Sequence, residues 1–189
     1  MEAFKKLEVQ EITKDLILKI CIFGEMNVGK SSLLHTFAPE MFNNRIKPSM
    51  YIDIAVKTVI IDSSQITLQI WILGTELSFK FIFSAFTIGA SGGIFMFDLT
   101  KYSSLRDIED WQLAFKESLG SDKKEIPIIM VGGKSDLSKE RMISRRSAKK
   151  LSKKYNFLEY FECSSKTGEN VKQIFEFLTR SIIKFEECI

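Results

Sequence analysis

Short apolar runs alternate with longer amphipathic runs along most of the chain. Runs rich in β-branched and aromatic residues predict buried strands; they are Leu16–Phe23, Gly93–Asp98, Ile126–Val131 and Leu158–Cys163. Runs with apolar residues at helical spacing predict helices; they are Lys30–Phe37, Ser103–Leu119, Ser144–Tyr155 and Asn170–Ile183. The last of these carries a single apolar stripe, which indicates a helix packed on one side.

One part of the pattern predicts a hairpin. Tyr51–Ile61 and Ile66–Leu73 are strand-like runs that flank the polar segment Asp62-Ser63-Ser64-Gln65. Strands that alternate with helices favour an α/β domain with a mostly parallel sheet, to which the hairpin adds an antiparallel edge strand. Ligands of such sheets bind beyond the carboxyl ends of the strands, so functional residues are expected in the loops there.

The composition is that of one globular domain. The 189 residues are 45% hydrophobic and 27% charged, which excludes a disordered chain, a collagen-like repeat and a disulfide miniprotein. The net charge of +3 is too small to favour nucleic acid as a partner. With three scattered cysteines, no signal-peptide core and no long uncharged apolar run, we expect a cytoplasmic protein whose membrane contact, if any, is peripheral. We also expect a monomer.

The most specific motif lies between the first predicted strand and the first predicted helix. Gly24-Glu25-Met26-Asn27-Val28-Gly29-Lys30-Ser31 fits the phosphate-loop pattern G-x-x-x-x-G-K-[ST]. Its backbone N–H groups and the helix N-terminus form a nest for phosphate, Lys30 reaches the phosphates, and the Ser31 hydroxyl is suited to Mg²⁺. The predicted phosphate-binding residues are Gly24, Asn27, Val28, Gly29, Lys30, Ser31 and Ser32.

Two further motifs follow later strands. Gly133-Lys134-Ser135-Asp136 comes after Ile126–Val131, and Ser164-Ser165-Lys166 comes after Leu158–Cys163. Together with the phosphate loop, they resemble the small GTPases of the Ras superfamily, most closely the Rab-like branch.

The resemblance covers nearly the whole chain and implies a P-loop NTPase G domain over residues 16–185. It implies a six-stranded, mostly parallel sheet with one antiparallel edge strand and helices on both faces. Residues 1–15 would be an N-terminal extension and residues 186–189 a short tail.

The resemblance implies how guanine is recognised. The Asp136 carboxylate would accept hydrogen bonds from the ring N–H and the amine of guanine, a donor pair that adenine lacks. The Lys134 stem and Phe42 would pack against the base, and the loop of Ser164, Ser165 and Lys166 would meet its O6 atom. Gly133 departs from the family, which has Asn there to brace the base loop against the phosphate loop. We therefore expect weaker nucleotide affinity.

The switch regions depart further. Ser49 stands 18 residues after Ser31, the family's spacing for the first-switch Thr that binds Mg²⁺. In the second switch, Ile72 replaces the Asp that holds Mg²⁺ through water. Thr75 replaces the Gly that meets the γ-phosphate, unless a one-residue slip puts Gly74 there. Glu76 replaces the Gln that orients the attacking water.

Two other features of the sequence weigh against rapid hydrolysis or nucleotide-driven release. Met26 lies in the phosphate loop, where a long side chain would crowd the γ-phosphate and any arginine finger. The second-switch region is crowded with apolar residues, of which about half are expected to pack on the sheet and the rest to form a partner face. They are Leu77, Phe79, Phe81, Phe83 and Phe86.

These residues predict a guanine-nucleotide switch protein that binds GTP or GDP with Mg²⁺ and contacts effectors or regulators through its switches. Catalysis would fall to Lys30, with Glu76 as a general base the weaker interpretation, so hydrolysis of GTP to GDP and phosphate is expected to be slow. The alternative is a non-cycling interaction scaffold of the same fold. An ATP-using P-loop kinase fits less well, because such an enzyme would not need Asp136.

Overall fold

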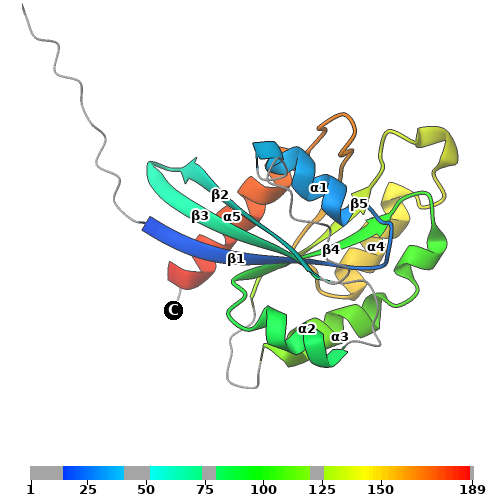
Figure 1. The fold of residues 1–189 in the computed structure, drawn as a ribbon. Helices are drawn as coiled ribbons and strands as arrows, with labels where there is room; N and C mark the ends of the chain where they lie inside the picture. The colour runs from blue at the N-terminus through cyan, green and yellow to red at the C-terminus, as the bar shows by residue number, and fades with distance from the viewer. Residues whose placement is uncertain (1–14, 41–51, 74–79, 120–125, 188–189) are drawn as a thin grey trace, which may run out of the picture.

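A mixed sheet forms the centre of the computed structural model, which describes residues 15–40, 52–73, 80–119 and 126–187 (Figure 1). The strands are β1 (Asp15–Phe23), β2 (Ile52–Ile61), β3 (Ser64–Leu73), β4 (Gly92–Asp98), β5 (Ile128–Gly133) and β6 (Tyr160–Glu162). The helices are α1 (Lys30–Phe37), α2 (Lys80–Thr87), α3 (Ile108–Ser118), α4 (Arg145–Lys154) and α5 (Val171–Glu187). Two 3₁₀ turns, η3 (Tyr102–Leu105) and η4 (Ser138–Glu140), complete the described elements.

The sheet has the predicted topology. Its order is β2-β3-β1-β4-β5-β6, and every neighbouring pair is parallel except β2 and β3. The antiparallel strand β2 lies at the edge. The predicted α/β class with a six-stranded, mostly parallel sheet is therefore confirmed.

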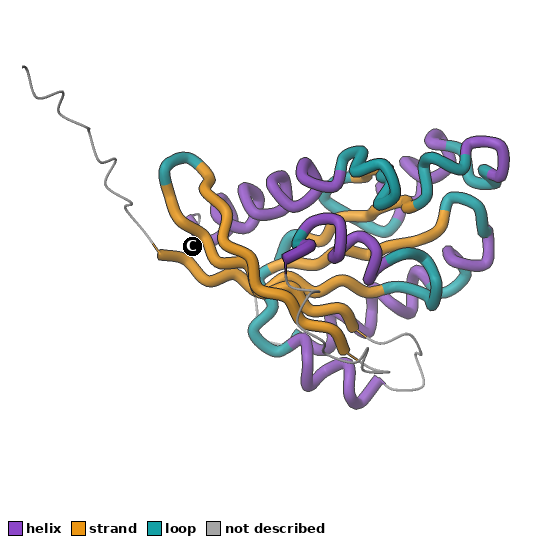
Figure 2. The backbone as a smooth tube through the Cα atoms, turned by 45° about the horizontal axis from the view of Figure 1, so that its top comes forward, coloured by secondary structure: helices purple, strands orange, loops and turns teal. Residues whose placement is uncertain are grey.

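Helices cover both faces of the sheet and enclose two apolar layers (Figures 1 and 2). On one face α1 and α5 pack together, with the rings of Phe37 and Phe175 stacked 3.8 Å apart. On the other face α2, α3 and α4 cover the sheet, and Phe23 of β1 stacks on Phe115 of α3 at 4.6 Å. Because both layers are filled, the strand ends that carry polar loops are held in fixed positions.

The predicted hairpin is confirmed, and its turn is tighter than the sequence indicated. Asp62 and Ser63 have φ angles of 49° and 66°, the left-handed conformation at both positions that a two-residue type I′ loop requires. Asp62 also forms an ion pair with Arg180 of α5. The turn therefore fixes the β2–β3 register, and the ion pair connects the hairpin to α5.

The helix predicted over Ser103–Leu119 is wrong in its first turn. The segment begins as η3, and α3 starts at Ile108. The Ser104 hydroxyl accepts a hydrogen bond from Asp98 N at 3.0 Å and donates one to Lys101 O at 2.7 Å. These local side-chain bonds compete with the α-helical pattern and hold the chain in a 3₁₀ turn beside the end of β4.

Candidate functional site

The turn from β1 into α1 has the geometry of an anion-binding loop. Gly24 has φ 135°, and a Cβ atom there would lie 2.1 Å from Met96 O, so the β4 backbone leaves no room for a side chain. Gly29 precedes α1 with φ 107°, and Asn27 is left-handed with φ 63°. Glycine tolerates such angles at little cost, which lets the backbone wrap tightly in front of the helix N-terminus.

Lys30 is the first residue of α1, and its side chain reaches back to the start of this loop. Its side chain is buried, with 5% exposed, and Nζ donates hydrogen bonds of 2.8 Å to the carbonyl oxygens of Gly24 and Glu25. Burial lowers the pKa of the Lys30 ammonium to about 8, and the Glu25 carboxylate acts in the opposite direction. Both acceptors are neutral carbonyls, so the positive charge remains available to an anion such as phosphate.

A pocket lies between α1 and the loop after β6. It has a volume of about 490 Å³ and is lined by Ser31, Ser32, His35, Thr36, Ser165 and Lys166. Thr36 Oγ1 donates a hydrogen bond of 2.7 Å to Ser165 O. The structure thus brings together predicted phosphate-loop residues and predicted base-loop residues that are more than 120 positions apart in sequence.

Lys134 is the second residue of the predicted Gly133–Asp136 motif and follows β5 directly. It is left-handed, with φ 64°, and its Nζ lies 2.6 Å from the buried Asp98 Oδ2. Burial raises the pKa of the Asp98 carboxyl, but hydrogen bonds from Lys134 and Thr100 outweigh it and hold the pKa below its usual value. The ammonium group of Lys134 is thus anchored at the end of β4.

Asp136 is oriented by the loop after β6. Its Oδ1 accepts a hydrogen bond of 2.6 Å from the fully buried Ser164 hydroxyl, and Ser164 Oγ in turn accepts one of 3.1 Å from Thr167 N. A carboxylate fixed on one side in this way can present an acceptor to a ligand without losing side-chain entropy on binding. The structure therefore joins Asp136 to the Ser164–Lys166 segment, as the sequence predicted.

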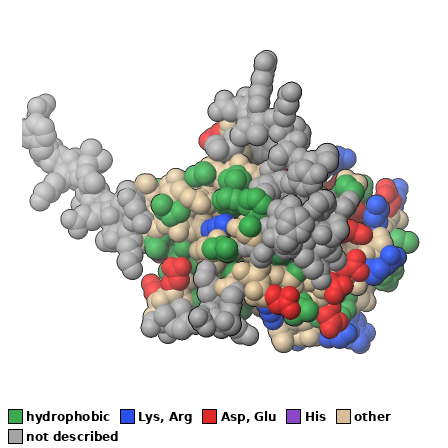
Figure 3. Space-filling model, turned by 60° about the horizontal axis from the view of Figure 1, so that its bottom comes forward, with side chains coloured by type: hydrophobic (Ala, Val, Ile, Leu, Met, Phe, Trp, Pro, Cys, Tyr) green, Lys and Arg blue, Asp and Glu red, His purple; other side chains and the backbone are tan. Residues whose placement is uncertain are grey.

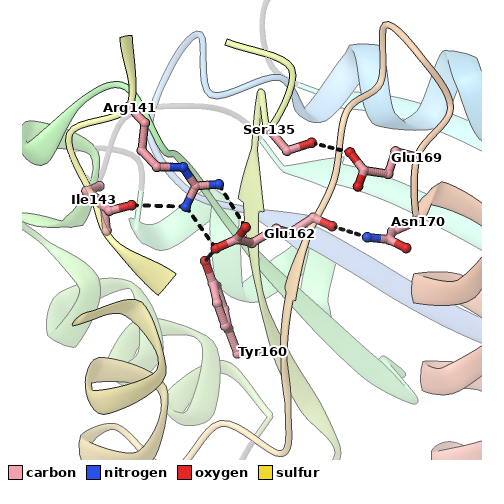
Figure 4. A network of polar contacts seen from close by, with 7 residues as sticks. All are labelled: Ser135, Arg141, Ile143, Tyr160, Glu162, Glu169 and Asn170. Carbon is pink, nitrogen blue, oxygen red and sulfur yellow. Dashed lines mark hydrogen bonds and ion pairs between the residues drawn. The ribbon is translucent and has the colours of Figure 1, made fainter. Parts of the chain in front are cut away.

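A second layer of polar contacts supports these loops (Figure 4). Arg141 makes two hydrogen bonds to the Glu162 carboxylate, at 3.1 and 2.8 Å. Asn170 Nδ2 donates to Glu162 O at 2.8 Å, and Ser135 Oγ donates to Glu169 Oε2 at 2.8 Å. The end of β6 is thereby tied to the segments before α4 and α5.

Gly133 lies where the two loops approach each other. A Cβ atom at this position would be 2.7 Å from Met96 Cε and 3.0 Å from Val28 O. The Met96 methyl also lies 3.4 Å from the corresponding point on Gly29. A methionine side chain therefore fills the contact between phosphate loop and base loop.

Asp53 is a candidate site residue that no sequence motif predicts. Its Oδ2 lies 3.4 Å from Ser31 Oγ, and in the β2–β3 ladder it pairs with Ile72. A signal was present in β2, where Asp53 is the one carboxylate in a strand of mostly apolar residues. The strand register that brings it beside Ser31 could not be derived from the sequence.

Several predicted residues lie outside the described part of the chain. They are Phe42, Ser49, Gly74, Thr75, Glu76, Leu77 and Phe79. Within it, Ile72 is buried in the layer beneath α1, and Met26 is 51% exposed. Phe83 packs in the opposite layer against Phe23 and Trp111, so it belongs to the half of the phenylalanine set expected in the core.

A phosphate loop after β1 and a lysine–aspartate loop after β5, on a sheet of this order, define the class of P-loop nucleotide-binding domains. The model of the Ras family matches residues 19–184. The chain therefore belongs to the Ras family, and it is a Rab-like small GTPase by its relatives.

Three relatives show this similarity. Ras-related protein Rab-13 of Bos taurus is 31% identical over 169 residues, which cover 89% of this chain and 81% of the relative. Rab-3C of Bos taurus is 35% identical over 162 residues, covering 86% and 70%. Rab-7a of Dictyostelium discoideum is 29% identical over 175 residues, covering 92% and 86%.

Proposed function

We propose that this chain binds GDP and GTP, that Asp136 selects guanine, and that hydrolysis is slow. The observation that carries the proposal is that the Ser164–Lys166 loop contacts both sides of the site. Ser165 O accepts a hydrogen bond from Thr36 of α1, the helix that begins at Lys30, and Ser164 donates one to Asp136. One nucleotide can then reach the phosphate nest with its phosphates and Asp136 with its base. The hydrogen bond from Ser164 would leave Asp136 preoriented for the guanine donors.

At the phosphate end, Lys30 and the N–H groups between Gly24 and Ser31 would hold the β- and γ-phosphates. The buried ammonium supports this role, because an anion would offset the desolvation that lowers its pKa. The Ser31 hydroxyl, at the start of α1, is an oxygen ligand of the kind that Mg²⁺ prefers. When bound, Mg²⁺ supplies charge neutralisation between the phosphates.

Slow hydrolysis follows from the second switch. Ile72 offers no oxygen atom at a position that is packed into the core, and Glu76 would bring negative charge toward the triphosphate. Phosphoryl transfer depends on positioning and charge stabilisation, and neither residue provides them. The long side chain of Met26 would also crowd the γ-phosphate.

Protein partners would dock beside the switches. The outer face of β2 carries Ile54, Val56 and Ile60, which are 47%, 43% and 75% exposed. Apolar and basic side chains are visible together on the face shown in Figure 3, and Lys19 Nζ lies 4.1 Å from the centre of the Trp71 ring. Exposed apolar area on a sheet next to a ligand site is typical of a partner-binding face.

We expect the protein in the cytoplasm or at a membrane surface. None of the described helices has both the length and the apolar character needed to cross a bilayer. The limits of the G domain, residues 16–185, are part of this proposal.

Measuring the nucleotide retained by freshly purified protein tests the binding proposal. We expect close to one GDP or GTP per chain and no adenine nucleotide. Asp136→Ala should lose the guanine nucleotide, because the carboxylate that pairs with both guanine donors is gone. Asp62→Asn, which removes a carboxylate at the distant hairpin turn, should retain it. Retention of ATP, or equal retention by Asp136→Ala, contradicts the proposal.

Single-turnover hydrolysis tests the catalytic part. With GTP at equimolar concentration, we expect a rate about 10²-fold below that of Rab-13 measured in parallel, comparable to the loss of one transition-state contact. Ile72→Asp combined with Glu76→Gln should raise the rate at least about tenfold, whereas Ile72→Val should not change it. A rate equal to that of Rab-13 in the unaltered protein contradicts slow hydrolysis.

The second candidate is a scaffold that does not cycle. The filled contact between Met96 and Gly133 favours it, because a rigid link between the two loops does not depend on nucleotide. Protein purified without any nucleotide, and unable to take up added GDP or GTP with Mg²⁺, would support the scaffold over the switch.

A further inference from the structure

A P-loop domain needs more than its loop hydroxyl to hold Mg²⁺. The ion takes six oxygen ligands in near-octahedral arrangement, and proteins usually supply one or two carboxylates in addition to phosphates. In P-loop enzymes this carboxylate belongs to the strand beside the loop. On β3 the position that the family resemblance assigns to this carboxylate is Ile72, which is 5% exposed and packed under α1.

Asp53 lies one strand away from Ile72. The two residues are directly opposite in the antiparallel β2–β3 ladder, where Cβ atoms are about 4.5–5.5 Å apart. Opposed residues point to the same face of a sheet, and Ile72 faces α1. Asp53 therefore reaches the N-terminus of α1 from the next strand.

The contact between Asp53 and Ser31 agrees with this register. Asp53 Oδ2 is 3.4 Å from Ser31 Oγ, which is long for an O–H···O hydrogen bond. Adjacent oxygen ligands around Mg²⁺ are separated by about 3 Å, since Mg–O distances are about 2.0–2.1 Å. The separation of the two oxygens is within about 0.5 Å of the spacing between neighbouring ligands, so a small side-chain movement would let both reach one cation.

The rest of the site makes the ion dependent on nucleotide. Among the described residues, no group of three or more His, Cys, Asp and Glu side chains is arranged to hold a metal. A hydroxyl and one carboxylate form too small a set for Mg²⁺ alone, and nucleotide phosphates would complete it.

We propose that Asp53 supplies the carboxylate for Mg²⁺ that Ile72 cannot supply, so that the metal site is built from α1 and β2 instead of α1 and β3. The inference rests on the proposed binding of guanine nucleotide. Asp53 then acts either as a direct ligand or through a water in the ion's shell.

Release of a fluorescent GDP analogue, measured across a Mg²⁺ titration, tests this role. In the unaltered protein, Mg²⁺ should slow release. In Asp53→Asn the midpoint of the titration should rise by about 10- to 100-fold, the usual cost of losing a carboxylate that supports a metal site, while release in excess EDTA stays unchanged. Asp62→Asn is the matched control, because it removes one carboxylate just beyond the opposite end of β2, and its midpoint should not move.

A rescue variant separates a metal role from a folding role. Adding Ile72→Asp to Asp53→Asn should bring the midpoint back toward that of the unaltered protein, because the carboxylate returns to the facing position. An unchanged midpoint in Asp53→Asn overturns the inference while leaving nucleotide binding intact. Failure of the unaltered protein to bind the GDP analogue at all would instead overturn the proposed function.

Discussion

At the scale of single residues, Met96 links the two halves of the candidate site. Its methyl group approaches both Gly29 and Gly133, and its side chain is 1% exposed. The contact is apolar and unbranched, so it fills space without directing a hydrogen bond to Val28 O. A polar brace at position 133 would have to displace this methyl group.

Placing an asparagine at position 133, so that its amide bonds to the phosphate loop, is therefore predicted to need two substitutions. Gly133→Asn alone should lower stability by about 1–3 kcal/mol, because its Cβ overlaps Met96 Cε and crowds Val28 O. Combined with Met96→Val, it should slow release of bound GDP below the rate of the unaltered protein, since the amide can then bond to the phosphate loop. Thermal unfolding and GDP release measure the two effects, with Met96→Val alone as control. Release at the unaltered rate in the double variant would contradict this account.

At the scale of elements, the Arg141–Glu162 pair joins the end of β6 to the segment before α4. The side chains are 27% and 12% exposed, so the pair is shielded more than most surface ion pairs. Burial raises the pKa of the Glu162 carboxyl, but hydrogen bonds from Arg141 and Tyr160 prevail and hold the pKa below its usual value. The ionised form of Glu162 is thus the one that stabilises this junction.

Removing Arg141 should cost stability in a pH-dependent way. Arg141→Met keeps the apolar stem and should lower the free energy of unfolding by about 1–2 kcal/mol at neutral pH. Because the folded pKa of Glu162 lies below the usual pKa of a glutamate carboxyl, the contribution is complete at pH values above that usual pKa. It should fade as the pH falls through the folded pKa. Urea unfolding at a series of pH values measures it.

The exposed pair Lys172–Glu176 offers the control for this prediction. Its side chains are 79% and 42% exposed, and Lys172→Met should change stability by less than about 0.5 kcal/mol. A difference between Arg141→Met and the unaltered protein that stays constant on acidification would assign the loss to packing instead of charge.

The elements themselves were largely predictable from the sequence, because periodicity and the phosphate-loop pattern are local. Lys30–Phe37 was predicted with the bounds that α1 has. Which set of β2 side chains turns toward the covering helix was not predictable. Ile54 is exposed, while Asp53 points toward α1. An edge strand has a helix on one face only, so the alternation of polar and apolar residues does not say which set turns inward.

The candidate site was predictable to the extent that it lies on contiguous motifs. Lys30, Asp136 and Ser164 were found because each follows a strand within a recognisable pattern. Asp53 was missed because its closeness to Ser31 depends on the β2–β3 register and on the packing of α1 over the sheet. Those are tertiary properties, and no short motif encodes them.

At the scale of the whole molecule, the nucleotide would be a structural link. The phosphate loop extends from β1, and the base loop extends from β5, with β4 between them in the sheet. The Met96 methyl group approaches both loops, at Gly29 and at Gly133. The loop after β6 adds a second link, because it contacts α1 through Thr36–Ser165 and the base loop through Ser164–Asp136. A ligand held at both ends would add a further connection, so binding should stabilise the fold as a unit.

Guanine nucleotide is therefore predicted to raise the melting temperature far more than adenine nucleotide. GDP at 100 times its Kd, with Mg²⁺, should add about 2.7 kcal/mol, which corresponds to an increase of about 5–10 °C for a domain of this size. ADP at the same concentration should give almost none, because it lacks the donor pair for Asp136. Asp136→Ala should lose the response to GDP without losing the fold. Equal shifts with GDP and ADP would mean that the phosphate loop alone holds the ligand and that Asp136 does not read the base.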